Sequence, residues 1–362
     1  MPHRPSNHVL FLVLLVVAGC GESTPPEPTV KPGTEATATE LPSHENRPLT
    51  ASQLREKLGA SSKARFEKVA GQFVEADLAE SGVSDISALH GLRLKSLNLS
   101  ANPVADLTPV EGMPLEALQL KRTQVADLSP LKGMPIKELD ISETPVADLA
   151  PLTGMKLKQL DLSQTKVTSL AALEGMPLEQ LWFEKAPVES LAPLTGMSLT
   201  TLWCRESQVS DLSPLEGMPL RELNLCQTGV TDLTPLKKSP LLTLWLRDTP
   251  VTDLSPLREM QLVSLDIQGT GVADLEVIAL LPTLKRLNIA GTSITDLRPL
   301  EGMPLERLIF TPGRITEGLD IVRTLPALRE LDIEFEGTAR TPAAFWAAYD
   351  AGEFSAQKPL SR

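Results

Sequence analysis

The chain has 362 residues and a formal net charge of −12 at pH 7. An acidic chain is repelled by nucleic acids and by anionic lipid headgroups, which argues against binding to either through basic charge. Aromatic residues make up only 4% of the sequence, with Tyr349 as the single tyrosine, so the core is expected to use a small set of aliphatic side chains repeatedly.

The first twenty residues have the features of a secretion signal. Arg4 precedes an apolar run at 9–18, which is too short to span a bilayer as a helix and fits the hydrophobic part of a signal peptide. The run ends in the letters VAGC, which resemble the lipobox of bacterial lipoproteins. The resemblance implies that Cys20 is lipidated and becomes the first residue of a chain anchored in the cell envelope. An uncleaved anchor and an ordinary signal peptide are the alternatives.

Two further segments precede the regular part of the chain. Residues 21–48 are rich in Pro, Thr and Glu and nearly free of apolar residues, so they predict a disordered tether. Residues 49–72 contain the stretches SQLREKL and ARFEKVAGQF, which predict a helical N-terminal cap.

From about residue 73 to residue 336 the sequence repeats itself in about thirteen turns. The phrase Asp-Leu-x-Pro-Leu recurs every 21 residues and then twice at 22, and Leu-x-x-Leu-x-Leu lies between successive phrases. The phrases begin at Asp85, Asp106, Asp127, Asp148, Ser169, Ser190, Asp211, Asp232, Asp253, Asp274, Asp296 and Gly318.

A period in the low twenties with Leu-x-x-Leu-x-Leu is the leucine-rich-repeat signature. The wording of this repeat resembles the short bacterial repeats of the internalin type. The resemblance implies an α/β solenoid with a parallel β-sheet on its concave face and short helical or 3-10 segments on its convex face. It also implies binding of a protein partner on the concave face.

Each recurring position has an expected structural task. Leu97 and Leu99 are expected to face inward, whereas Ser96 and Asn98 face outward, because side chains alternate along a strand. The Asp of each phrase is expected to be a helix N-cap, and Gly-Met-Pro to end the short helical segment. A threonine hydroxyl is expected to bond backbone inside the turn at Thr123, Thr144, Thr165, Thr228, Thr249, Thr270 and Thr292. We therefore interpret these residues as structural, not catalytic.

Two cysteines lie within the repeats. Cys204 occupies an inward position and Cys226 an outward one. Because the two face opposite ways in neighbouring turns, no disulfide is predicted.

The C-terminal residues, 337–362, are expected to form a cap and tail. A helix is predicted from Thr341-Pro342 through AAFWAAYD, with Phe345, Trp346 and Tyr349 on its apolar face. Such a cap covers the open end of a solenoid. The alternative is a docking helix for a partner.

The outward positions change character midway along the repeats. Trp182, Trp203 and Trp245 recur at the same outward position, and Asn224 interrupts them. Tryptophan and arginine are enriched in binding hot spots, so this stripe predicts a binding site. The alternative is that the indoles stack on each other and stiffen the sheet. The ligand-binding residues predicted with the tryptophans are Glu184, Arg205, Glu206, Arg247 and Asp248.

Upstream of this stripe, Glu138, Asp140 and Asp161 lie side by side at outward positions. They suggest either a cation site or, as we prefer, a solvated acidic face.

No catalytic or cofactor motif is present. The four histidines, His3, His8, His44 and His90, allow no Ser-His-Asp arrangement within the repeats, and there is no phosphate-binding loop or metal motif. We predict no enzyme activity, no cofactor and no metal. The preferred function is binding of a protein partner by a module that contacts the membrane only through its lipid anchor. The alternatives are glycan binding by the tryptophans and a structural envelope component without a ligand.

Overall fold

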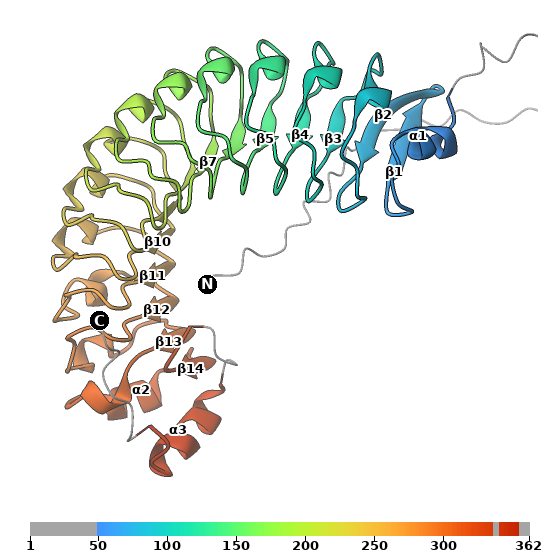
Figure 1. Ribbon diagram of the computed structural model, residues 1–362. Coiled ribbons are helices and arrows are strands. Elements are labelled where there is room, and N and C mark those ends of the chain that lie inside the picture. Colours follow the sequence, from blue (N-terminus) through green and yellow to red (C-terminus); the bar gives the residue numbers. More distant parts are fainter. Residues whose placement is uncertain (1–48, 336–339, 355–362) are drawn as a thin grey trace, which may run out of the picture. The chain divides into compact units, whose positions relative to one another are not determined.

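The computed structural model describes residues 49–335 and 340–354 (Figure 1). The expected signal, Cys20 and the tether at 21–48 lie outside the described residues, as does most of the expected tail. Within the described part, no helix has the length and apolar character needed to cross a membrane.

One fourteen-stranded sheet runs through the repeats, with its strands in sequence order from β1 to β14. β1 (Arg65–Val69) and β2 (Gln72–Asp77) are antiparallel, and every later strand pairs in parallel with the one before it. From β3 to β11 each residue pairs with the residue 21 positions later, as Leu97 does with Leu118. The later strands are β3 (Ser96–Asn98), β4 (Ala117–Gln119), β5 (Glu138–Asp140), β6 (Gln159–Asp161), β7 (Gln180–Trp182), β8 (Thr201–Trp203), β9 (Glu222–Asn224), β10 (Thr243–Trp245), β11 (Ser264–Asp266), β12 (Arg286–Asn288), β13 (Arg307–Ile309) and β14 (Glu330–Asp332).

The core lies between the sheet and the return segments. The middle residue of each short strand points inward and is buried, as Leu97, Leu202 and Leu223 are, and its two flanking residues point outward. The expected alternation along the strands is therefore confirmed.

A 3-10 helix of three residues lies on the opposite side of most turns (Figure 1). The 3-10 helices are η2 (Ser87–Leu89), η3 (Thr108–Val110), η4 (Ser129–Leu131), η5 (Ala150–Leu152), η6 (Ala171–Leu173), η7 (Ala192–Leu194), η8 (Ser213–Leu215), η9 (Thr234–Leu236), η10 (Ser255–Leu257), η11 (Ile278–Leu280), η12 (Arg298–Leu300) and η13 (Pro312–Arg314). α2 (Leu319–Thr324) is an α-helix in the last turn.

The repeated aspartate, expected to be the N-cap of the short helix, instead precedes the N-cap residue by one position. In the turn that contains Asp106, the N-cap position belongs to Leu107, and the Asp106 carboxylate accepts a hydrogen bond from the backbone N–H of Thr108 at 2.8 Å. This is an Asx turn, in which a side chain replaces a backbone acceptor. The aspartate is structural, as predicted, but it orders the approach to the helix and does not cap it.

The threonine prediction is confirmed at all seven positions. Each hydroxyl donates to the backbone carbonyl three residues earlier, as Thr228 Oγ1 does to the carbonyl oxygen of Leu225 at 2.7 Å. All seven threonines are buried, so each bond satisfies a carbonyl that water does not reach. The equivalent bonds belong to Thr123, Thr144, Thr165, Thr249, Thr270 and Thr292.

The predicted N-terminal cap is helical only in its first third. α1 (Ala51–Lys57) begins at Thr50, whose side chain and that of Gln53 form a capping box. Residues 65–77, expected to be helical up to 72, instead form the hairpin of β1 and β2. Ala70 and Gly71 both have positive φ, 49° and 80°, which is the backbone that a two-residue hairpin turn needs. The hairpin extends the sheet by two strands beyond β3.

At the other end, the predicted helix is α3 (Pro342–Asp350), with the side chain of Thr341 as its N-cap. Phe345 and Trp346 are buried, and Phe345 contacts Phe310 and Phe354 at ring-centroid distances of 5.6 and 5.0 Å. The apolar face of α3 is thus used within the chain, which favours a cap over a docking helix.

Candidate functional site

The three predicted tryptophans occupy the last position of their strands, at Trp182 in β7, Trp203 in β8 and Trp245 in β10. All three are half-buried on the outward side of the sheet. The parallel register aligns Trp182 with Trp203, and Asn224 lies between Trp203 and Trp245. The sheet therefore carries the stripe that the sequence predicted.

At this strand position seven other turns use a residue with a structural task, whereas β4 and β13 have Gln119 and Ile309 there. Asp or Asn there accepts a hydrogen bond from the backbone N–H two residues later, as Asp140 does from Ser142 at 2.8 Å. The same bond is made by Asp77, Asn98, Asp161, Asn224, Asp266 and Asn288. An indole has no acceptor for this N–H. After Trp182 the N–H of Glu184 donates instead to Ser163 Oγ of the preceding turn, at 3.2 Å.

The turns that carry Trp182 and Trp203 also lack other structural residues of the repeat. Ala186 and Ser207 stand where seven other turns have the threonine that bonds the strand carbonyl, and the Ser207 hydroxyl does not make that bond. Before these strands, Ser169 and Ser190 replace the aspartate, and their bonds to backbone N–H are 3.3 and 3.2 Å long, against 2.8 Å for Asp106. The turns around Trp182 and Trp203 therefore make fewer or longer structural hydrogen bonds than the other turns do.

Trp203 contacts the indole of Trp245, two strands away, although Trp182 is on the adjacent strand. Trp203 and Trp245 meet edge to face, with ring centroids 5.6 Å apart and planes at 73°. They reach each other across Asn224, which is only 1% exposed. Trp203 Nε1 and Asn224 Nδ2 are buried donors without a partner. The alternative interpretation, that indoles contact each other, therefore applies to this pair, whose members are two turns apart and meet edge to face without stacking.

Charged residues beside the tryptophans are tied to one another. Arg205 forms an ion pair with Glu206 at 2.8 Å, and its guanidinium also donates to Gln227 Oε1 at 3.0 and 3.1 Å. Glu206 lies 3.8 Å from Lys185 Nζ in the preceding turn. The predicted residues Arg205 and Glu206 thus lie together, next to Trp203.

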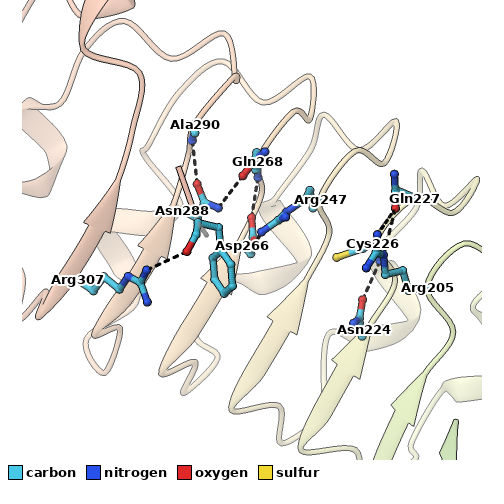
Figure 2. A network of polar contacts seen from close by, with 11 residues as sticks. Arg205, Asn224, Cys226, Gln227, Arg247, Asp266, Gln268, Asn288, Ala290 and Arg307 are labelled. Carbon is cyan, nitrogen blue, oxygen red and sulfur yellow. Dashed lines mark hydrogen bonds and ion pairs between the residues drawn. The ribbon is translucent and has the colours of Figure 1, made fainter. Parts of the chain in front are cut away.

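Arg247 belongs to a second group of polar residues (Figure 2). Its Nη2 donates to Asp266 Oδ2 at 3.0 Å, and Asp266 Oδ1 accepts from the N–H of Gln268. Gln268 Oε1 in turn accepts from Asn288 Nδ2 at 3.0 Å. Burial raises the pKa of the Asp266 carboxyl above its ordinary value, although Arg247 beside it acts in the opposite direction.

The other two predicted residues lie at the edges of these groups. Glu184 is half-buried in the turn after β7, and Asp248 is exposed in the turn after β10, with a positive φ of 55°. Neither residue belongs to the network of Figure 2.

Cys226 was expected at an outward position, and its side chain is buried, at 3% exposure. It lies in the same column of neighbouring turns as Arg205 and Arg247, which are long enough to cover it. Burial raises the pKa of the Cys226 thiol to about 12, and that of Cys204 rises for the same reason. Both cysteines are free thiols, in agreement with the prediction of no disulfide.

The acidic residues upstream do not form a solvated face throughout. Asp161 is buried, Asp140 accepts from the N–H and hydroxyl of Ser142, and burial raises the pKa of Glu138. Among the residues that the structure describes, no group of three or more His, Cys, Asp or Glu side chains is arranged to hold a metal ion.

Three residues beside the site were not predicted from the sequence. Asp266 and Asn288 are the Asp or Asn that is usual at the last strand position, so nothing in the sequence sets them apart. Phe335 lies after the last strand, outside the repeat. The Phe335 ring lies 4.9 Å from Arg247 Cζ and 5.3 Å from Arg307 Cζ. Such a contact has no periodic signal, because it depends on a non-repeating segment that returns to the sheet.

Comparison with solved structures identifies the architecture. An internalin from Listeria monocytogenes, inlF, has a TM-score of 0.65 and 21% sequence identity, over 80% of this chain and 90% of that one. The fold is a leucine-rich-repeat solenoid. Its parallel sheet forms the concave face and its 3-10 helices the convex face, as predicted. No protein-family model and no curated protein matches the sequence.

Two further solenoids are similar at lower scores. The leucine-rich-repeat protein LIC12759 of Leptospira interrogans has a TM-score of 0.51 at 19% identity, over 71% of this chain and 77% of that one. A plant peptide hormone receptor, RGFR1, solved in complex with RGF2, has a TM-score of 0.50 at 15% identity, over 75% of this chain and 56% of that one. At such identities the likeness concerns the fold.

Proposed function

We propose that this solenoid is a protein-binding module whose concave face, at Trp182, Trp203 and Trp245, contacts a protein partner. The observation that carries the proposal is the presence of tryptophan in three turns at the position where seven other turns use Asp or Asn as an acceptor for the turn. Half-buried indoles flanked by arginine match the composition of binding hot spots. The internalin and receptor neighbours support the proposal only through their shared fold.

The geometry of the indoles favours a protein over a glycan. An extended sugar chain would stack on aromatic rings that present parallel faces, whereas the planes of Trp203 and Trp245 are inclined by 73°. An irregular apolar surface surrounded by charged residues that are paired with one another suits protein side chains better.

The proposal includes a lipid anchor at Cys20 that holds the solenoid in the cell envelope. Its support is the VAGC ending of the apolar run at 9–18. Labelled fatty acid is expected to enter the full chain but not a Cys20→Ala variant, which should leave the membrane fraction. Labelling of both chains would contradict the anchor without affecting the binding proposal.

Capture from envelope extract tests the binding site. Full-length chain is compared with a variant in which Trp182, Trp203 and Trp245 are replaced by Asn, the residue that supplies the missing acceptor in other turns. We expect one partner, identified by mass spectrometry and then purified, to bind the original chain and to lose at least about 100-fold in affinity for the variant, as loss of a hot spot implies.

A convex-face variant, Lys132→Ala, Thr153→Ala and Glu174→Ala, is the matched control, because these three residues are exposed on the opposite side. It should bind as the original chain does. Equal affinity of the purified partner for the original chain and the tryptophan variant would refute the site.

A further inference from the structure

Part of the concave face is covered by the chain itself. The last residues of β11, β12 and β13 are Asp266, Asn288 and Ile309, and all three are buried to 4% exposure or less although they occupy outward positions. At the equivalent place in β3 and β4, Asn98 and Gln119 are half-buried. Asp161 in β6 and Asn224 in β9 are buried at this place as well, so burial alone does not identify a cover. Over the later strands, however, the structure also shows the segment that covers them.

The residues after β14 return to this surface. Phe335 places its ring between two guanidinium groups, those of Arg247 after β10 and Arg307 in β13. Arg307 Nη2 also donates to the backbone carbonyl oxygen of Phe335, at 3.3 Å. Because the two arginines are three strands apart, the ring lies over β11 to β13. Figure 2 shows both arginines directed toward the region between them.

The C-terminal cap does not need this contact. Its aromatic cluster consists of Phe310, Phe345, Trp346 and Phe354, which contact one another without Phe335. Phe335 is only half-buried, and Glu334 beside it is exposed. The base of the segment is held to β14, where the N–H of Leu331 donates to the carbonyl oxygen of Arg340 and Arg340 forms an ion pair with Asp332. Phe335 itself is held to the concave face by its two arginine neighbours. An external segment of the same chemistry can compete for that contact while the base stays in place.

The surface between the arginines continues the tryptophan stripe. Arg247 follows Trp245 by two residues on the same side of the sheet, and its Nε is buried without a hydrogen-bond partner. Arg307 Nε, by contrast, lies 3.4 Å from Glu330 Oε2. Guanidinium groups attract aromatic faces and donate to carbonyl oxygens. Phe335 supplies both features, so it shows which ligand the surface accepts.

We propose that the surface between Arg247 and Arg307 is a docking site for an extended peptide that presents an aromatic side chain, and that Phe335 occupies this site until a partner displaces it. The proposal names the kind of partner segment that the concave face takes, and to that extent it rests on the proposed function. The partner then contacts the tryptophans and the arginine surface together.

The test uses the full chain and a Phe335→Ala variant with a fluorescently labelled peptide, acetyl-Asp-Ile-Glu-Phe-amide, which has the sequence of residues 332–335. The matched probe is acetyl-Asp-Ile-Glu-Ala-amide. We expect the Phe peptide to bind the variant at least about tenfold more tightly than the original chain, because the vacated site no longer has an internal competitor. Fluorescence anisotropy measures both.

Arg247→Lys in the Phe335→Ala background is expected to weaken the Phe peptide, since lysine keeps the charge beside Asp266 but loses the planar group. If Phe335→Ala does not fold by circular dichroism, Phe335→Leu keeps apolar volume without the ring, and the same expectation applies. Equal binding by the original chain and the variant, or equal binding of the two peptides, would overturn the proposal.

The proposed function fails separately. The variant with Asn at the three tryptophans should still bind the Phe peptide once Phe335 is replaced, although it loses the envelope partner. Loss of peptide binding with retained partner capture would remove only the arginine site.

Discussion

The turns of β3 to β6 and those of β7 to β10 have the same backbone but make different use of the last strand position. In the first group, Asn98, Asp140 and Asp161 complete the turn that follows the strand. In the second, only Asn224 does so, and Trp182, Trp203 and Trp245 stand at the other places. The difference teaches that a repeat keeps its backbone while one strand position varies, and the proposed binding surface lies where that position departs furthest from the turn-forming residues.

The largest expected loss of stability comes from the core, which should respond alike in the two groups of turns. Leu118→Ala in β4 and Leu202→Ala in β8 each remove a fully buried side chain, and each should lower the free energy of unfolding by about 2–5 kcal/mol. Urea unfolding followed by circular dichroism and by tryptophan fluorescence measures both. A much smaller loss at Leu202 would mean that the core itself differs near the tryptophans.

A smaller effect should separate the groups. Thr144→Val leaves the carbonyl of Ile141 buried without its partner and should cost about 1–3 kcal/mol. Ser207→Ala removes a buried hydroxyl that does not make this bond and should cost less. The same urea experiment compares them, and an equal loss at Ser207 would show that its hydroxyl does stabilise the turn.

A still smaller change is expected for Trp182→Asn. Asn gains the acceptor that the turn uses elsewhere, which offsets the lost indole packing, so stability should change by less than about 1.5 kcal/mol. The thermal unfolding midpoint checks this. Asp140→Trp is the reverse variant and should lower the midpoint, because it removes two hydrogen bonds to Ser142.

The smallest effect concerns pH. The pKa of Asp266 is raised in the folded state, so the native chain binds this proton more tightly than the unfolded chain does. Stability from this group therefore falls as pH rises above the ordinary value of 3.8 and levels off above the folded-state pKa. Asp266→Asn keeps an acceptor for Gln268 and removes the titration. Its stability relative to that of the original chain should therefore increase as pH rises across this interval. Urea midpoints at successive pH values measure the gain, and parallel curves would contradict the raised pKa.

What the sequence predicted and what it missed differ in physical origin. The inward leucines, the threonine bonds and the stripe of tryptophans follow from a period, because every turn repeats the same local geometry. The hairpin at 65–77 was missed because apolar spacing was interpreted as helical, although Ala70-Gly71 marks a tight turn. The Trp203–Trp245 pair required knowing that Asn224 is small enough to be bridged, and the position of Phe335 required the path of a segment outside the repeat.

The constant register of the sheet fixes the distance between any two turns as a whole number of strand spacings. Since each residue of β3 to β10 pairs with one 21 positions later, deletion or duplication of one whole turn reproduces the same neighbours on both sides of the junction. Each such edit would move Trp182 by about 4.8 Å relative to the hairpin of β1 and β2. The distance of the tryptophans from the N-terminal end therefore changes in steps of one turn, and turns whose inward residues are alike could be added or removed with the least change to the core.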